Sequence, residues 1–112
     1  MSTPSVSLDL DGLGRIGVAL ADDTRRRILV TLIAGPAYPS DLADQLDSTR
    51  ANISNHLACL RGCGMVRAQP EGRRVLYQLA DPRLGRALSD LLGLVLITSP
   101  ESCPASADEG CC

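Results

Sequence analysis

The chain has 112 residues, of which 45% are hydrophobic and 2% aromatic, and its net charge is −2. This length fits one domain with a modest aliphatic core, and such a core is often completed by pairing with a second copy. Membrane-spanning and secreted classes are not expected, because the chain lacks a run of about 18–20 apolar residues and a signal-peptide pattern. We therefore expect a cytoplasmic protein with reduced thiols, and the odd number of five cysteines argues against a disulfide framework. With one histidine, no glycine-rich phosphate loop and no paired carboxylates in a plausible cleft, an enzyme is not expected either.

The charges are distributed unevenly along the chain. Residues 48–86 carry seven arginines against two acidic residues, a balance of +5, whereas the segments on either side are net acidic. A basic middle between acidic ends is typical of a protein that binds nucleic acid with one face. A solvated arginine-rich face is the alternative, and charge alone does not decide between them.

The first half of the chain predicts three helices. Residues 10–21 place apolar side chains at helical spacing. Residues 22–35 begin with acidic capping residues and stop at Gly35, which precedes a proline. Residues 39–46 have a proline in their first turn and apolar residues on one side. These three segments are expected to pack their apolar sides together.

A fourth helix is predicted over residues 50–64. Thr49 is its candidate N-cap, and the apolar spacing buries Ile53, Leu57 and Leu60. The remaining positions are mostly polar or small. One side of this helix should therefore face the core and the other side should face solvent.

The last third predicts a β-hairpin, a helix and a tail. Residues 65–80 alternate like strands on either side of QPEGR, residues 69–73. Residues 81–97 form an apolar helix with Asp81 as its cap, and residues 98–112 are a polar, flexible, cysteine-containing tail. The fold class is thus mainly α with a small β-hairpin, with residues 1–97 as one DNA-binding and dimerisation domain.

Two short helices joined by about three residues and followed by a hairpin form a winged helix-turn-helix. The second helix should enter the major groove of double-stranded DNA, and the hairpin tip should lie at the adjacent minor groove or its phosphates. A winged-helix module that binds protein is the alternative. The candidate DNA-binding residues are Thr49, Arg50, Asn52, Ser54, Asn55, His56, Arg73 and Arg74.

Two cysteines share one side of the predicted recognition helix. At about 100° per residue, His56, Cys59 and Cys63 fall within an arc of about 60°, and the spacing of the thiols lets them share one ion. Buried packing and a redox switch are the alternatives, although a disulfide at this spacing requires helix distortion. Three further cysteines lie in the tail, where packing does not explain them. These are Cys103, Cys111 and Cys112.

Four segments together resemble a known family. ALADDTRRRILVTL, YPSDLADQL, STRANISNHLACLRGCGMV and GRRVLYQLAD are similar to the ArsR/SmtB metal-sensing repressors over about residues 10–97. Within that family, HLACLRGCG followed by a C-terminal cysteine resembles the cadmium- and lead-responsive CmtR branch. The family often has glycine where Asp47 ends the first helix of the motif, a position that aspartate tolerates.

The resemblance implies a homodimer, paired through its N- and C-terminal helices, that leaves its operator DNA when metal binds. It also implies Cys59 and Cys63 as metal ligands, with Cys103 reaching in from the tail of the partner subunit. Cys111, Cys112 and His56 are further candidates. The implied effector is Cd(II) or Pb(II), while Zn(II), Cu(I) and As(III) also suit thiolates. A thiol-redox repressor remains the rival within this fold.

Overall fold

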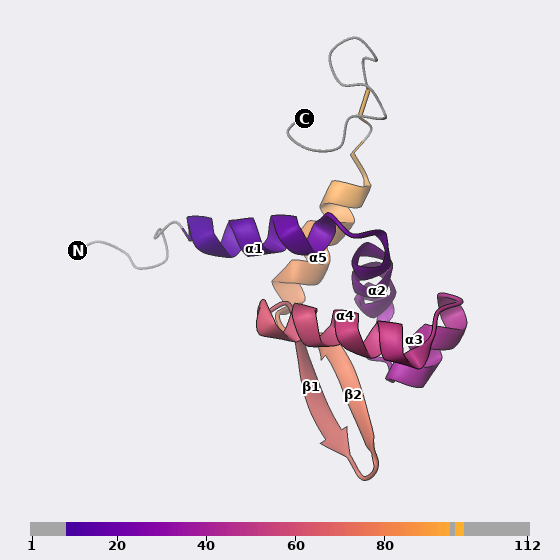
Figure 1. The fold of residues 1–112 in the computed structure, drawn as a ribbon. Coiled ribbons are helices and arrows are strands. Elements are labelled where there is room, and N and C mark those ends of the chain that lie inside the picture. Colours follow the sequence, from indigo (N-terminus) through magenta and orange to yellow (C-terminus); the bar gives the residue numbers. More distant parts are fainter. Residues whose placement is uncertain (1–8, 95, 98–112) are drawn as a thin grey trace, which may run out of the picture.

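The computed structural model describes residues 9–94 and 96–97. Figure 1 shows the first helix projecting from the body on one side and the hairpin projecting below it. The elements are α1 (Leu10–Leu20), α2 (Asp23–Ala34), α3 (Pro39–Gln45), α4 (Arg50–Gly62), β1 (Val66–Glu71), β2 (Arg74–Leu79) and α5 (Pro82–Leu92). This order confirms the predicted winged helix-turn-helix.

Side-chain caps fix where the helices begin. The Thr49 hydroxyl accepts the backbone N–H of Asn52 at 3.0 Å, and Asp81 accepts the N–H of Arg83 at 2.8 Å. Both caps were expected from the sequence, and each satisfies a donor that the first turn of a helix leaves free. The start of α4, and with it the register of the recognition helix, is therefore set by its own local sequence.

The last helix is shorter than predicted, because α5 ends at Leu92 and not at residue 97. Gly93 caps it, and its N–H contacts the carbonyls of Ser89 and Asp90 at 3.1 and 3.2 Å. Glycine disfavours a helix by about 1 kcal/mol relative to alanine. Beyond it, Leu96 and Ile97 are 78% and 95% exposed, so no packing of these two side chains against the described residues offsets that cost.

The hairpin is tighter than the sequence suggested. Its two antiparallel strands pair from Val66–Leu79 to Glu71–Arg74, which leaves a two-residue turn of Gly72 and Arg73. Gly72 has φ +63°, a conformation that two-residue hairpin turns require and that glycine adopts without strain. The wing tip therefore presents Arg73 in the turn and Arg74 directly after it.

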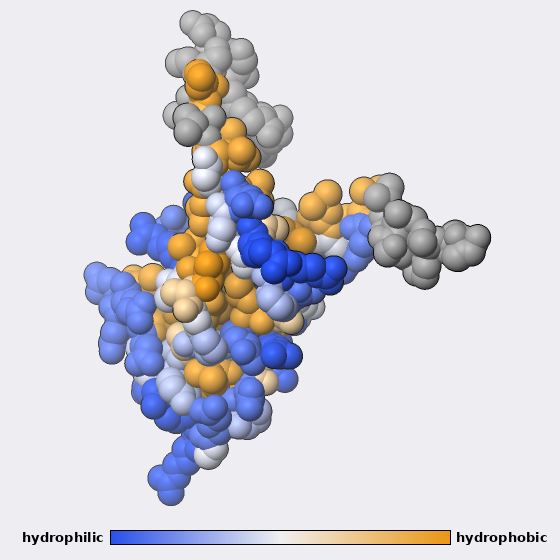
Figure 2. All heavy atoms as spheres, turned by 180° about the vertical axis from the view of Figure 1, so that it is seen from behind, coloured by the Kyte–Doolittle hydropathy of each residue, from blue (hydrophilic) through white to orange (hydrophobic). Residues whose placement is uncertain are grey.

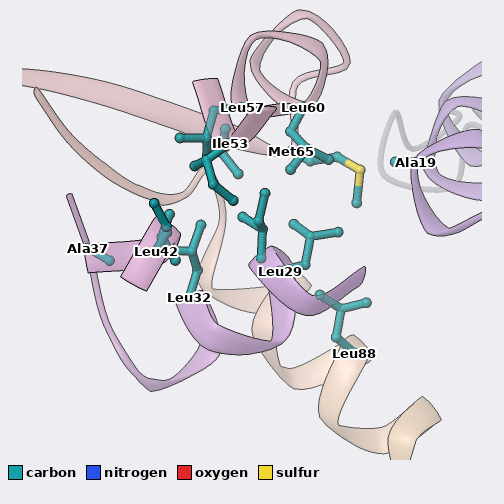
Figure 3. Close-up of a cluster of buried hydrophobic side chains, with 13 residues drawn as sticks. Ala19, Leu29, Leu32, Ala37, Leu42, Ile53, Leu57, Leu60, Met65 and Leu88 are labelled. Atoms are coloured by element: carbon teal, nitrogen blue, oxygen red, sulfur yellow. The ribbon is translucent and has the colours of Figure 1, made fainter. Parts of the chain in front are cut away.

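The core lies between the helices and the base of the hairpin (Figure 3). α2, α3 and α4 supply its centre, and each fully buried aliphatic side chain stabilises the fold by about 1.5–3 kcal/mol. The largest fully buried side chains are Ile28, Leu29, Leu42, Ile53, Leu57 and Leu60. The three from α4 are the ones that the sequence predicted.

The wing is attached to the body at its base. The backbone groups of Ala37 and Tyr77 exchange two hydrogen bonds, each of 2.9 Å. Ala37 lies just before α3, so this bridge ties β2 to the first helix of the motif. The wing consequently has a fixed origin beside α3 and α4.

Most of the exposed large apolar side chains lie on α1 and at or beyond the end of α5. Figure 2 shows apolar side chains on the projecting α1 and along the α5 side of the molecule. They are Leu10, Leu13 and Val18 on α1, and Leu91, Leu92, Leu94, Leu96 and Ile97 at and beyond the end of α5. Among the described helices, none is long and apolar enough to cross a lipid bilayer.

Candidate nucleic-acid interface and thiol pair

The turn between α3 and α4 sets the angle of the recognition helix. Asp47 has φ +52°, in the left-handed region, and the N–H of Ser48 donates to the carbonyl of Ala43 at 2.9 Å. Aspartate is among the few residues other than glycine that adopt this conformation at modest cost. Asp47 therefore adopts the left-handed conformation that glycine usually adopts in a turn that ends a helix.

The N-terminal half of α4 presents an exposed polar face. Arg50, Ser54 and Asn55 are exposed, as predicted for residues that meet DNA. Asn52 is exposed too, but its side-chain amide donates to the Ser48 hydroxyl at 2.9 Å. Asn52 thus braces the turn, whereas the other three present groups that the described chain does not bind.

His56 differs from the other candidate DNA-binding residues, because its side chain lies against Asp22. Its side chain is 19% exposed, and its Nε2 lies 3.8 Å from Asp22 Oδ2. The pKa of Asp22 is lowered, first by the hydrogen bond from the Arg25 N–H and further by the charge of His56 when it is protonated. His56 therefore faces the start of α2, a contact across 34 sequence positions that helical spacing could not reveal.

A hollow of about 400 Å³ lies between the tip of the wing and the start of α4. Arginine side chains from both elements line it, and no carboxylate is among the described residues of its lining. The polar residues around it are Tyr38, Ser40, Arg50, Ser54, Arg73, Arg74 and Tyr77. Four of these are among the DNA-binding residues that the sequence predicted: Arg50, Ser54, Arg73 and Arg74. Tyr38 and Ser40 were not among those candidates.

The two thiols of the described chain lie at the opposite end of α4. Cys59 is exposed, and Cys63 is partly buried and packs against the core. Cys63 caps the helix, with its N–H donating to the Cys59 carbonyl at 3.0 Å. Its αR backbone (φ −83°, ψ −3°) continues the helical path for one more residue. The predicted spacing of one turn between the thiols is therefore present.

Cys63 also lines a second hollow, of about 650 Å³, formed with α1 and the start of α5. Asp81 and Arg83 stand at this hollow and form an ion pair of 2.8 Å. The Arg83 guanidinium and its backbone N–H lower the pKa of Asp81 to about 2. The thiol end of the recognition helix thus adjoins the two helices that carry the exposed apolar side chains.

Within residues 9–94 and 96–97, no cluster of three histidine, cysteine or acidic side chains could hold a metal ion. Cys59 and Cys63 could supply two ligands of such a site. The predicted third ligand Cys103, and the further candidates Cys111 and Cys112, lie outside the described residues.

The helix-turn-helix, the wing and the basic face between them define a winged helix-turn-helix DNA-binding protein. Residues 22–68 match the model of the bacterial regulatory protein, arsR family. Over 94 residues the chain is 55% identical to the HTH-type transcriptional regulator CmtR of Mycobacterium tuberculosis, covering 83% of this chain and 80% of that protein. The chain belongs to the ArsR family of bacterial transcriptional regulators.

Two solved structures agree with this assignment. The NMR structure of the cadmium metal-sensor CmtR from M. tuberculosis has a TM-score of 0.65 at 52% identity, covering 84% of this chain and 99% of that one. The homodimeric winged helix-turn-helix DNA-binding domain of Mb0332 from Mycobacterium bovis has a TM-score of 0.71 at 29% identity, with coverage of 82% and 84%.

Proposed function

We propose that this protein is a metal-responsive repressor, which binds operator DNA as a homodimer and releases it when a thiophilic metal ion binds its cysteine thiolates. The observation that carries the proposal is the placement of Cys59 and Cys63 on α4, the helix whose other end presents Arg50, Ser54 and Asn55. The similarity to CmtR, whose solved structure is described as a cadmium sensor, supports it.

The DNA-facing surface is the outer side of α4 together with the wing tip. Side chains near the start of α4 suit the major groove, and the wing arginines suit the phosphates beside it. The candidate contacts remain Arg50, Asn52, Ser54, Asn55, Arg73 and Arg74, with Thr49 as the helix cap. His56 is a weaker candidate, because it is largely buried against Asp22.

The homodimer is proposed to form through α1 and α5, within a domain of residues 1–97. Both helices expose large leucines that a monomer leaves in water, and the homodimeric relative supports pairing. Two copies would place two recognition helices on one duplex, as dimeric regulators of this kind require. The protein would act in the cytoplasm, where operator DNA is found.

The donor chemistry indicates which ions the thiols would hold. Two cysteines one turn apart suit a soft or borderline ion, and the similarity to a cadmium sensor favours Cd(II). Pb(II) also prefers thiolate ligands and is proposed beside it. Zn(II), Cu(I) and As(III) are compatible with the same ligands. Cys103 is the proposed third ligand, with Cys111 and Cys112 as further candidates in the tail.

The residues around the thiols explain how metal binding could weaken contacts at the DNA-binding face. A bound ion would supply a cross-link among deprotonated thiolates, with a net charge of about −1 for three thiolates on a divalent ion. Cys63 packs against the core and adjoins α1 and α5, so drawing it toward a tail cysteine strains the end of α4. The strain and the added negative charge both oppose phosphate contact.

The test is a fluorescence anisotropy titration of the reduced protein on the promoter DNA upstream of its own gene. Cd(II), Pb(II), Zn(II), Cu(I) and As(III) are added separately without oxygen. We expect one or two of these ions to weaken binding by about 5–150-fold, the usual range for one effector. Binding that no ion changes, or release by an oxidant in metal-free buffer, would overturn the proposal.

A further inference from the structure

The aromatic side chain of Tyr38 connects the end of the wing to the start of α3. Its hydroxyl donates a short hydrogen bond to the carboxylate of Glu71. The Arg74 guanidinium lies over its ring, 3.5 Å from the centroid, and also reaches the Ser40 hydroxyl at 3.5 Å. One side chain from outside the wing thus holds both residues of the last strand pair before the turn.

These contacts give the wing a second point of attachment. The first is the backbone bridge between Ala37 and Tyr77 at the base. Arg74 lies three residues before Tyr77 in β2, about 10 Å nearer the wing tip in an extended strand. A hairpin held at two levels against the same segment resists swinging about its base, which favours one position of its arginines relative to α4.

The stacked geometry leaves Arg74 able to bind an anion. A guanidinium that places its flat face on an aromatic ring keeps its N–H donors in its own plane, where they can reach a phosphate oxygen. The hollow beside it is also lined by Arg50 and Arg73, one from α4 and one from the turn. Three arginines from three elements therefore converge on one space.

Glu71 is the acidic group nearest to this basic surface on the wing, and Tyr38 binds it. The hydrogen bond to Glu71 raises the pKa of the Tyr38 phenol above its ordinary value, so the phenol stays protonated and donates to the carboxylate. Held in this way, the carboxylate is not among the side chains that line the hollow. The arrangement keeps negative charge out of the space where a phosphate would lie.

We propose that Tyr38 is a positioning residue for DNA binding, which holds Arg74 and Glu71 so that the hollow between the wing and α4 accepts one phosphate of the operator backbone. The inference rests on the proposed function, because it names a contact of that DNA-binding face. Tyr38 acts on DNA through Arg74, and Ser40 supports the same guanidinium.

The test compares operator affinity and its salt dependence among variants, using a fluorescein-labelled duplex of the promoter. Arg74→Ala removes one phosphate contact from each subunit of the homodimer, so it is expected to weaken operator binding at least about tenfold and to lower the salt slope by about 2. Tyr38→Leu should lose a similar factor and the same slope. Tyr38→Phe keeps the ring under Arg74 but frees the Glu71 carboxylate, so it should retain the wild-type slope and bind DNA more weakly than the wild type, by a smaller factor than Tyr38→Leu.

A double-mutant cycle separates positioning from a general loss of structure. Tyr38→Leu with Arg74→Ala should bind more weakly than Arg74→Ala alone by no more than the factor lost in Tyr38→Phe, because both changes remove the same contact and only the freed Glu71 carboxylate adds to the loss. Arg67→Ala is the matched control, since Arg67 is exposed on β1 outside the hollow, and its effect should add to that of Tyr38→Leu. Additive effects of Tyr38 and Arg74, or wild-type affinity in Tyr38→Leu, would overturn the inference.

Two further outcomes identify what has failed. If the wild-type protein binds no duplex, the proposed function itself is wrong. A titration of the DNA-free protein with inorganic phosphate, followed by NMR, tests the other source of this anion. Saturable shifts around the hollow that Tyr38→Leu abolishes, with operator affinity and salt slope unchanged in that variant, would assign the hollow to a free anion and contradict the assignment to DNA.

Discussion

The two ends of α4 have different surroundings. At the start, Thr49 caps the helix and polar side chains face outward beside the wing. At the end, Cys63 lies at the edge of the core and beside α1 and α5. Thirteen residues, about 20 Å of helix, separate these environments. One continuous element therefore joins the proposed DNA-binding end to the proposed metal-binding end.

The middle of α4 explains how the two ends could be coupled. Ile53, Leu57 and Leu60 are fully buried, so the helix is held along its whole inner side. A helix packed in this way moves as a rigid body, because interiors are close-packed and resist local deformation. A strain applied at one end is then transmitted to the other.

The largest effect is expected from a change in this buried middle. Leu57→Ala removes a fully buried side chain and should lower the free energy of unfolding by about 3 kcal/mol through lost burial and the cavity left behind. Urea denaturation followed by circular dichroism measures it. Ser54→Ala, on the exposed face one turn earlier, is the control and should change stability little. A loss below about 1 kcal/mol for Leu57→Ala would show that the middle is not rigidly packed.

The second prediction tests whether the thiol end of α4 controls the metal response without contributing to metal-free DNA affinity. Cys59→Ser and Cys63→Ser should each abolish the metal-dependent weakening of DNA binding, about 5–150-fold in the wild type, while metal-free affinity stays close to wild type. Anisotropy titrations with and without Cd(II) measure both quantities. Ala58→Ser, an exposed change next to Cys59, is the control and should keep the full response. If both cysteine variants keep the metal-dependent weakening of DNA binding, Cys59 and Cys63 are not the ligands through which metal releases DNA.

A smaller effect is expected at the other end, from the cap. Thr49→Ala removes the acceptor for the Asn52 N–H and should cost about 1 kcal/mol of stability. Thr49→Ser keeps a hydroxyl and should lose much less. Thermal melts measure the stability, and the metal response measured on DNA should keep its fold-change in both variants. A changed fold-change would mean that the Thr49 cap takes part in the coupling between metal and DNA binding.

The smallest effect concerns the turn before α4. Asp47→Gly relieves a left-handed backbone but adds freedom to the unfolded chain, so we expect a net gain of at most about 1 kcal/mol. Asp47→Ala keeps the strain without the aspartate side chain and should destabilise the protein. Urea denaturation of the three proteins ranks them. A glycine variant less stable than the alanine variant would contradict this interpretation of the turn.

The sequence predicted the elements whose causes are local. Thr49 and Asp81 cap helices through neighbours three and two residues away, and the burial of Leu57 follows from helical spacing. Periodicity also gave the positions of Cys59 and Cys63 on one side of α4. These features depend on residues within about one turn of each other, so the sequence contains them directly.

Contacts between distant segments could not be predicted in this way. Tyr38 and Glu71 are 33 residues apart, and nothing in either local pattern indicates that the wing folds against the start of α3. The contact of His56 with Asp22 depends likewise on how α4 packs on α2. The early end of α5 is consistent with the exposure of Leu94, Leu96 and Ile97, which the apolar composition of residues 91–97 did not indicate.

Reciprocal linkage between the ends of α4 tests whether metal binding at one end opposes DNA binding at the other. The affinity for Cd(II) is measured from thiolate-to-metal charge-transfer absorbance, with and without a saturating promoter duplex. If metal at one end opposes DNA at the other, DNA must weaken Cd(II) binding by the same factor by which Cd(II) weakens DNA binding. Equal Cd(II) affinity with and without DNA would show that metal binding and DNA binding are not coupled through α4.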